Sequence, residues 1–427
     1  MRIDAKMLYN HMEIKRDIHL QRIVGSMHNG MIKVITGIRR CGKSYLLMKL
    51  FRNYLLEHGV SADHIIMLDL ENRRNKQYRD PDALIEYLDA QMKDDQMYYI
   101  LLDEIQMVSE FEDVLNSYLS VPNADVYVTG SNSRFLSKDV ITEFRVRGEE
   151  IHVTPLSFKE FASIDPSMDF QSALGMYLTY GGLPKACLEE DEGKKIQYLQ
   201  GLFEKTYITD IQEHYHIRGC EEMGELINVI ASGIGGLTNP TKIENTFRTV
   251  KNIKMGKNTI KQYLEILEES FLVNKAIRYD VKGRHYIDTP QKYYFEDLGL
   301  RNARIGFRLV EQTHLMENLI YNELRLRGYI IDVGVVTENK RNEVGMMERR
   351  QLEVDFVCNR GSQRIYVQSA YRLPNEEKRA QEKASLLRIG DSFQKYIITE
   401  DFVPTHQDDD GIVWMNLKNF LYEGIEY

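Results

Sequence analysis

The stretch ITGIRRCGKSYLLMKLF, from Ile35 to Phe51, passes from apolar residues into glycine and basic residues and then back to an apolar pattern. The preceding segment, Lys33 to Thr36, is β-prone, and apolar residues from Ser44 onward recur at helical spacing. Gly37 to Gly42 is therefore expected to form a loop between a strand and a helix. Such a loop directs main-chain N–H groups toward an anion at the start of the helix.

The loop matches the P-loop pattern G-x-x-x-x-G-K-[ST] at Gly37, Gly42, Lys43 and Ser44. Glycines let the backbone close around phosphate oxygens, the lysine reaches the β- and γ-phosphates of ATP, and the Ser44 hydroxyl coordinates Mg²⁺. A basic turn that caps the helix is the competing interpretation. The residues expected to contact the nucleotide are Gly37, Ile38, Arg39, Arg40, Cys41, Gly42, Lys43, Ser44, Tyr45 and Asp103.

A second acidic element follows in MYYILLDEIQ, where the strand-like segment Tyr98 to Leu102 ends at Asp103 and Glu104. Asp103 suits the water-mediated contact with the Mg²⁺ that Ser44 coordinates. Glu104 suits the base that polarises the attacking water in phosphoryl transfer. Acidic pairs often end strands, so this interpretation depends on the P-loop upstream.

Further strand-like segments cover 64–71, 124–133 and 149–157, with helical stretches between them. Five strands alternating with helices predict a doubly wound parallel sheet, in an α/β P-loop NTPase fold. We expect the strand that carries Glu104 to lie next to the P-loop strand. Ser131 and Asn132, after the fourth strand, are expected to touch the γ-phosphate or its water, unless GSNS is simply a turn.

Arg145 and Arg147, in FRVRGEE, precede the fifth strand. A guanidinium there could stabilise the transferring phosphoryl group of a neighbouring subunit, which would make the protein a homo-oligomer. Surface arginines in salt bridges explain the same residues equally well.

These segments together resemble a known family. TGIRRCGKSYLL (36–47), YILLDEIQ (99–106), VTGSNS (128–133), RGEEIHVTPLSFKEF (147–161) and YGGLPKA (180–186) are similar, in this order, to prokaryotic AAA+ superfamily ATPases that carry a C-terminal region of unknown function of the DUF4143 type. The resemblance implies an AAA+ core at 1–157, a winged-helix module and a restriction-endonuclease-like C-terminal region. It implies no agreed cellular role.

The middle of the chain is predicted to be largely helical. Residues 158–217 are expected to form a helical lid beside the nucleotide, with Lys185 either near the phosphates or solvated at a helix start. Residues 218–304 are expected to form a winged helix, since helices there precede a β-ribbon. A local excess of basic residues, with Lys257, Asn258 and Lys261 at the start of the candidate recognition helix, suits contact with a DNA backbone. Winged helices also serve as protein-interaction or structural modules.

Residues 305–427 are expected to form the nuclease-like domain. An amphipathic helix containing Glu317 precedes three strand-like segments, and Asp355 occupies the position of a metal-binding aspartate. Gln368 and Ala370 stand where that pattern calls for a second carboxylate and a lysine. Without the second carboxylate the metal loses a charged ligand, and without the lysine the attacking water loses its positioning cation. We therefore expect a fold without efficient cleavage. A migrated site using Tyr371 or Arg372 is the alternative.

The composition suits several domains of a globular protein. The chain has 427 residues and a net charge of −9, so any nucleic-acid contact must rest on a local patch. The absence of a signal-like start and of a long apolar run favours a cytoplasmic protein without membrane contact. The four cysteines are widely spaced and suit free thiols. Three functions remain open: an ATP hydrolase that rearranges its C-terminal modules, a nucleotide-gated switch that recruits a protein partner, and an ATP-dependent nuclease.

Overall fold

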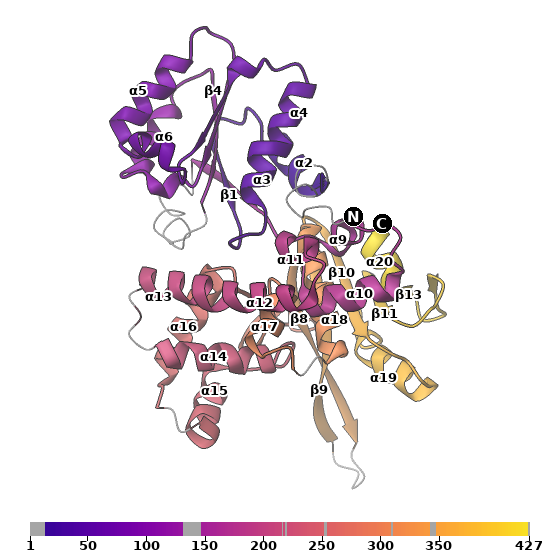
Figure 1. Cartoon of the computed structure of the whole chain (residues 1–427). Helices are drawn as coiled ribbons and strands as arrows, with labels where there is room; N and C mark the ends of the chain where they lie inside the picture. Colours follow the sequence, from indigo (N-terminus) through magenta and orange to yellow (C-terminus); the bar gives the residue numbers. More distant parts are fainter. Residues whose placement is uncertain are drawn as a thin grey trace.

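The computed structural model describes residues 13–130, 147–215, 217, 220–251, 254–308, 311–341 and 347–425. Two sheets dominate it, one of five strands and one of eight. The five-stranded sheet and its helices form the lobe at the top of Figure 1, helices α10, α12 and α14 run below it, and the larger sheet stands beside those helices. Within these residues, no helix combines the length and the apolar character needed to cross a bilayer.

The first sheet has the strand order β2-β3-β4-β1-β5, and each pair of neighbouring strands in it is parallel. Its strands are β1 (Ile32–Thr36), β2 (Ile65–Asp69), β3 (Tyr98–Asp103), β4 (Ala124–Thr129) and β5 (Gly148–His152). All residues of β1 and β3 are buried, as expected for parallel strands covered on both faces. The predicted parallel α/β sheet of a P-loop NTPase is confirmed.

One expectation about this sheet is wrong. The strand that carries Glu104 does not lie next to the P-loop strand, because β4 separates β3 from β1. The order of strands along the chain does not determine which strand pairs with β1. Here the chain goes from β1 to the edge strand β2 and then returns through β3 to β4, which pairs with β1. As a result, Thr129 at the end of β4 lies between the two predicted site segments.

The helices of this lobe cover both faces of the sheet. Ile35 packs into the core that continues toward the middle helices, whereas Ile32 and Val34 face the core on the other side. Asp80 caps α5 by accepting a hydrogen bond from the N–H of Ala83, followed by proline at the first turn. The helical segments are α2 (Asp17–Gly25), α3 (Lys43–Tyr45), η1 (Leu46–Phe51), α4 (Arg52–Glu57), η2 (Ala62–His64), η3 (Arg73–Arg79), α5 (Pro81–Gln91), η4 (Ile105–Met107) and α6 (Phe111–Tyr118).

The middle of the chain is helical, as predicted. Ser157 and Glu160 form a reciprocal capping box that starts α9, directly after the end of the first sheet. Asp169 and Asp191 cap the next long helices through their side chains. The segments are α9 (Phe158–Ala162), α10 (Phe170–Tyr180), α11 (Pro184–Leu188), α12 (Glu192–Leu202), η5 (Phe203–Ile208), α13 (Thr209–Tyr215), α14 (Cys220–Ser232), α15 (Pro240–Thr246), η6 (Phe247–Lys251), α16 (Lys257–Glu269) and α17 (Leu298–Arg304).

The second sheet has the order β12-β13-β11-β10-β9-β8-β6-β7 and mixes parallel and antiparallel pairs. Its strands are β6 (Val273–Asp280), β7 (His285–Phe295), β8 (Ile330–Arg341), β9 (Met347–Arg360), β10 (Gln363–Ala370), β11 (Gln394–Thr399), β12 (His406–Gln407) and β13 (Ile412–Asn416). The accompanying helices are α18 (Gln312–Leu326), α19 (Glu376–Leu386) and α20 (Leu417–Glu423).

The β-ribbon assigned to the winged helix belongs to this larger sheet. Strands β6 and β7 form an antiparallel hairpin, and β6 also pairs in parallel with β8 from Arg278 to Asp280. The ribbon therefore continues the sheet of the predicted nuclease-like region. The boundaries after residues 157, 217 and 304 stay predictions.

Candidate functional site

The P-loop follows β1 directly and lies against the end of β5. Gly37 and Gly42 have positive φ angles of 135° and 109°, which side chains rarely adopt. A Cβ on Gly37 would lie 2.1 Å from the carbonyl oxygen of Val153, so only glycine fits there. The two glycines of the motif thus set the path of the loop into α3.

Two side chains inside the loop point into the core. Ile38 and Cys41 are fully buried, and the Cys41 thiol donates to the carbonyl oxygen of Val153 at 3.2 Å. Burial raises the pKa of Cys41, which keeps this thiol neutral. These two side chains therefore fix the loop to the core, and only the main-chain groups of Ile38 and Cys41 are left to contact a ligand.

Arg16 holds the loop from a third direction. Its guanidinium donates to the carbonyl oxygens of Cys41 at 3.1 Å and Thr154 at 2.6 Å, and it pairs with Glu160 at 3.1 Å. A buried arginine with several acceptors orients them rigidly because its donors form a planar fork. Arg16 thus ties the P-loop to the end of the first sheet and to the start of α9.

Lys43, Ser44 and Asp103 converge at the carboxyl end of the sheet. The Lys43 ammonium donates to the carbonyl oxygens of Gly37 and Ile38 at 3.0 and 3.2 Å. The Ser44 hydroxyl donates to Asp103 Oδ1 at 3.0 Å, and the Thr129 hydroxyl donates to the same oxygen. Burial raises the pKa of Asp103, although both hydroxyls act in the opposite direction.

This hydroxyl–carboxylate pair fits Mg²⁺. Magnesium takes one or two protein ligands and completes its octahedron with water and phosphate oxygens. Ser44 and Asp103 are the residues that would hold the ion.

Glu104 is placed by an unusual backbone conformation. Its φ angle is 57°, in the left-handed region, and its N–H donates to the Thr129 hydroxyl at 3.0 Å. The Gln106 side-chain amide donates to the Glu104 carboxylate. A non-glycine residue held with positive φ costs free energy and tends to mark functional positions. Here the conformation turns Glu104 out of the strand direction and toward the cavity.

A cavity of about 450 Å³ is lined by seven of the predicted site residues. Arg39, Arg40, Gly42, Lys43, Ser44, Tyr45 and Glu104 all line it. The predicted residues Gly37, Ile38, Cys41 and Asp103 do not line it. Gly37, Ile38 and Asp103 instead accept hydrogen bonds from the lining residues Lys43 and Ser44. The cavity also takes in lining residues that the sequence did not indicate: Ile14, Arg16, Glu71, Leu156, Pro184, Leu188 and Tyr198.

Helices α11 and α12 close one side of this cavity. Pro184, Lys185 and Leu188 come from α11, and Tyr198 comes from α12. The Lys185 ammonium lies 4.7 Å from the centre of the Tyr198 ring. Lys185 therefore borders this cavity, but it is also exposed in the first turn of α11, so both positions considered for it stay predictions. The YGGLPKA signal indicated a helix break but carried no information about Tyr198.

The remaining predicted catalytic residues have different outcomes. Ser131, Asn132 and Arg145 lie outside the described residues. Arg147 is exposed and its guanidinium donates to the Asn116 side chain at 3.4 Å, away from the cavity lining. Its role in a neighbouring subunit stays a prediction. Thr129, the last residue of β4, joins the site instead; its place in the predicted strand-like segment 124–133 was the available signal.

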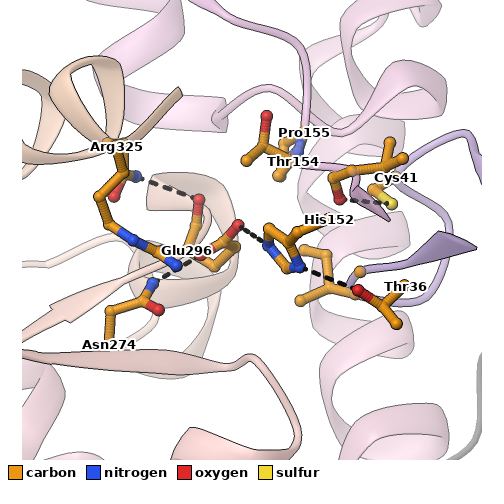
Figure 2. Close-up of polar contacts among 12 residues, drawn as sticks. Thr36, Cys41, His152, Thr154, Pro155, Asn274, Glu296 and Arg325 are labelled. Atoms are coloured by element: carbon orange, nitrogen blue, oxygen red, sulfur yellow. Dashed lines mark hydrogen bonds and ion pairs between the residues drawn. The ribbon is translucent and has the colours of Figure 1, made fainter. Parts of the chain in front are cut away.

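A polar network runs from the P-loop to the second sheet, as Figure 2 shows. Thr36, just before the loop, contacts His152 Nδ1 at 3.4 Å, and His152 Nε2 contacts Glu296 Oε1 at 2.8 Å. Glu296 also accepts hydrogen bonds from Asn274 at 2.5 Å and Arg325 at 2.9 Å. The buried Glu296 carboxylate thus joins β1 and β5 of the first lobe to β6 and α18 of the second.

Replacing Glu296 with glutamine should destabilise the protein by ~3 kcal/mol at neutral pH, because Arg325 loses its buried carboxylate. Burial acts to raise the pKa of Glu296, but Arg325 and His152 prevail and lower it to about 2. The stabilisation is therefore complete above the usual glutamate pKa and disappears as the pH falls toward 2. Thermal unfolding at pH 7 and pH 4 should show a smaller difference between variant and wild type at the lower pH.

The exposed Glu57→Gln variant is the matched control, because its carboxylate sits on the surface of the first lobe. It should unfold at the wild-type temperature at both pH values. A Glu296→Gln protein as stable as wild type at pH 7 would contradict this account of the network.

The predicted DNA-contact face on α16 is exposed. Lys257, Asn258 and Lys261 face solvent, whereas Ile260, Leu264 and Leu267 are buried on the other side of the helix. This polarity follows from the helical spacing of the apolar residues. The arrangement leaves the basic face accessible, and its DNA contact stays a prediction.

The predicted nuclease-like centre contains an unforeseen lysine. Lys292 from β7 is 3% exposed, and its ammonium lies 2.8 Å from Glu317, 2.7 Å from Glu353 and 3.7 Å from Asp355. Burial opposes the charge, but these carboxylates raise the pKa of Lys292. Burial and the charge of Glu317 raise the pKa of Asp355 to about 8.

Gln368 and Ala370 take structural positions beside this centre. Gln368 accepts from the Asp355 N–H at 3.3 Å and donates to Glu382 at 3.2 Å, while Ala370 is buried. The nuclease pattern calls for a lysine on the strand that carries Gln368 and Ala370. Lys292 instead belongs to β7, which precedes residue 305. Its ammonium is already held by carboxylates. The expected lack of efficient cleavage stays a prediction.

Two families match the chain. Residues 29–162 match the family described as "AAA domain". Residues 171–311 match a domain of unknown function, DUF8612, in place of the DUF4143-type region that the resemblance implied. The second match covers most of the predicted lid (158–217) and all of the predicted winged helix (218–304).

Relatives in two organisms align over most of the chain. An uncharacterized protein of Haemophilus influenzae is 33% identical over 416 residues, covering 96% of this chain and 99% of its own length. An uncharacterized protein of Methanocaldococcus jannaschii is 27% identical, covering 87% of this chain and 80% of its own length. Among solved structures, Cdc6p from Pyrobaculum aerophilum is 11% identical, and the alignment covers 74% of this chain and 99% of the Cdc6p chain. The TM-score is 0.31. The chain therefore belongs to one family with the Haemophilus influenzae protein, within the AAA+ superfamily of P-loop ATPases.

Proposed function

We propose that this protein hydrolyses ATP with Mg²⁺ at the cavity lined by Lys43, Ser44 and Glu104. The observation that carries the proposal is the shared contact at Asp103, whose Oδ1 accepts from Ser44 of the P-loop and from Thr129 of β4. This contact brings a hydroxyl, a carboxylate and the Glu104 backbone together at the carboxyl end of one sheet. Ligands of α/β folds bind at that end.

Each residue has a distinct task in this proposal. Lys43 exchanges its two loop carbonyls for the β- and γ-phosphate oxygens of ATP, which are stronger acceptors because they are charged. Ser44 and Asp103 hold Mg²⁺, which supplies charge neutralisation at those oxygens when bound. Glu104 orients the water that attacks the γ-phosphorus and accepts its proton. The products are ADP and inorganic phosphate.

The apolar and aromatic part of the cavity suits the nucleoside. Ile14, Leu156 and Leu188 supply apolar surface, and Tyr45 and Tyr198 supply rings. Because two of these residues come from α11 and α12, nucleotide binding would hold those helices against the first lobe. The network through His152 and Glu296 would pass a change at the P-loop to the second sheet.

Turnover by the purified full-length chain is the direct test. Phosphate release is measured with ATP and Mg²⁺, alone and with single-stranded or duplex DNA, alongside the mass of the protein in solution. We expect Mg²⁺-dependent phosphate release. Turnover that remains very slow with every addition, together with nucleotide that co-purifies, would favour the nucleotide-gated switch instead. No binding of ATP at millimolar concentration would refute the proposal.

A further inference from the structure

A second cavity, of about 600 Å³, lies on the larger sheet and is lined by three turns. The turn between β6 and β7 contributes Lys282 and Arg284, the start of β10 contributes Arg364, and the segment before β11 contributes Asp391 and Phe393. We call this cavity the basic-aromatic pocket. None of its residues belongs to the predicted ATP site.

The charges of the basic-aromatic pocket are unbalanced. Lys282, Arg284 and Arg364 line it against a single carboxylate, that of Asp391. Asp391 already accepts hydrogen bonds from the Tyr366 hydroxyl at 2.5 Å and from the Phe393 N–H at 3.3 Å. Within the described part of the chain, none of the three cations forms a salt bridge, although the protein as a whole carries a charge of −9. A polyanion would supply the missing negative charge.

Aromatic rings flank the central cation. The Arg364 guanidinium lies 5.1 Å from the centre of the Tyr279 ring and 5.8 Å from that of Phe393. Phe393 is 41% exposed, and Tyr286, which packs against Tyr279 at 5.3 Å, is 58% exposed. Large rings left in water beside a cavity offer stacking surface, and guanidinium planes stack on bases as well.

We propose that the basic-aromatic pocket binds single-stranded nucleic acid. Phosphates contact Lys282 and Arg284 on the exposed turn, and a base enters the cavity to stack on Phe393 and Arg364. Duplex DNA hides its base faces inside the helix and presents only phosphates to such a surface. An acidic peptide would use the cations but would leave the rings without a partner. The proposal is independent of ATP hydrolysis, and it assigns nucleic-acid contact to the tip of the β6–β7 hairpin instead of the basic face of α16.

The test is fluorescence anisotropy with the full chain, without ATP, using labelled oligothymidylate and oligouridylate of about 12 nucleotides. Binding of both probes is expected. The K282A/R284A variant should bind at least about tenfold more weakly, and the slope of log affinity against log salt should fall by about 1.4 because two phosphate contacts are lost. Phe393→Ala alone should weaken binding by about fivefold or more through lost stacking. These side chains are exposed, so thermal unfolding should confirm intact variants.

The matched control is R73A/R74A, which removes two exposed cations from the first lobe and should bind like wild type. Four results would overturn the proposal. Wild-type affinity in Phe393→Ala, or equal competition by polyglutamate, would show a site for any polyanion. Equal affinity for duplex DNA would show that no base enters. Loss of binding in K257A/K261A, with K282A/R284A unaffected, would assign nucleic-acid contact to α16.

Discussion

Lys43→Ala is expected to lower the rate of ATP turnover by about 10²- to 10³-fold, the usual cost of removing one electrostatic contact to a reacting group. In the structure Lys43 is 5% exposed, and its ammonium is held by two carbonyl oxygens of its own loop. Those neutral acceptors leave the full positive charge available for phosphate. The variant should also bind ATP more weakly, since the lysine contacts the ground state as well as the transition state.

The measurement pairs phosphate release with nucleotide binding by titration calorimetry. Arg52→Ala is the matched control, because Arg52 begins the next segment of the same helix and does not line the cavity. It should retain wild-type turnover. Loss of Lys43 leaves two loop carbonyls without this donor, so unfolding should be followed too, with an expected cost of ~1 kcal/mol. Unchanged turnover in a folded Lys43→Ala protein would remove the site assignment.

The local part of the nucleotide site could be predicted because it is continuous in sequence. The strand before Gly37, the glycine loop and the helix after Lys43 are neighbours along the chain, and each needs residue types that are recognisable there. The same holds for Tyr98–Asp103, whose buried run and terminal carboxylate show where a central strand ends. For such segments, covalent neighbours largely decide the geometry.

Residues that join the site through tertiary packing could not be predicted in this way. Arg16 reaches Cys41 and Thr154 across the fold, and Tyr198 reaches the cavity from α12. The position of β4 between β3 and β1 could not be predicted for the same reason, because the pairing of strands depends on how the crossover helices pack. An arginine or tyrosine on a helix face has many possible partners, and only the assembled core selects one.

Lys292 shows the same limit in the second sheet. The nuclease-like pattern covers the helix that contains Glu317 and the three strand-like segments after it, so a cation from β7 lies outside it. The β6–β8 pairing places β7 in the same sheet as β9 and β10, which brings Lys292 to Glu353 and Asp355. Burying that ammonium requires its carboxylates, and burial, together with the charge of Glu317, raises the pKa of Asp355. Charge compensation here follows from sheet topology.

Glu104→Gln is expected to lower phosphate release by about 10²- to 10⁴-fold while ATP affinity stays within a few-fold of wild type. Glutamine keeps the size and polarity of the side chain but cannot take a proton from water. The left-handed backbone at Glu104 and its N–H contact with Thr129 do not depend on the carboxylate, so the site should keep its shape. This separation of binding from turnover distinguishes Glu104 from Lys43, whose loss should impair both.

Single-turnover phosphate release, with ATP affinity from calorimetry, makes this separation measurable. Glu71→Gln is the matched control, because Glu71 lines the same cavity from the loop after β2. If Glu104 orients the water, only its variant should lose the chemical step, and the ATP-bound protein should accumulate. An equal loss of phosphate release in both variants would instead mean that turnover depends on the total negative charge of the cavity and not on one base at the position of Glu104. A Glu104→Gln protein that turns over ATP at the wild-type rate would place the base elsewhere.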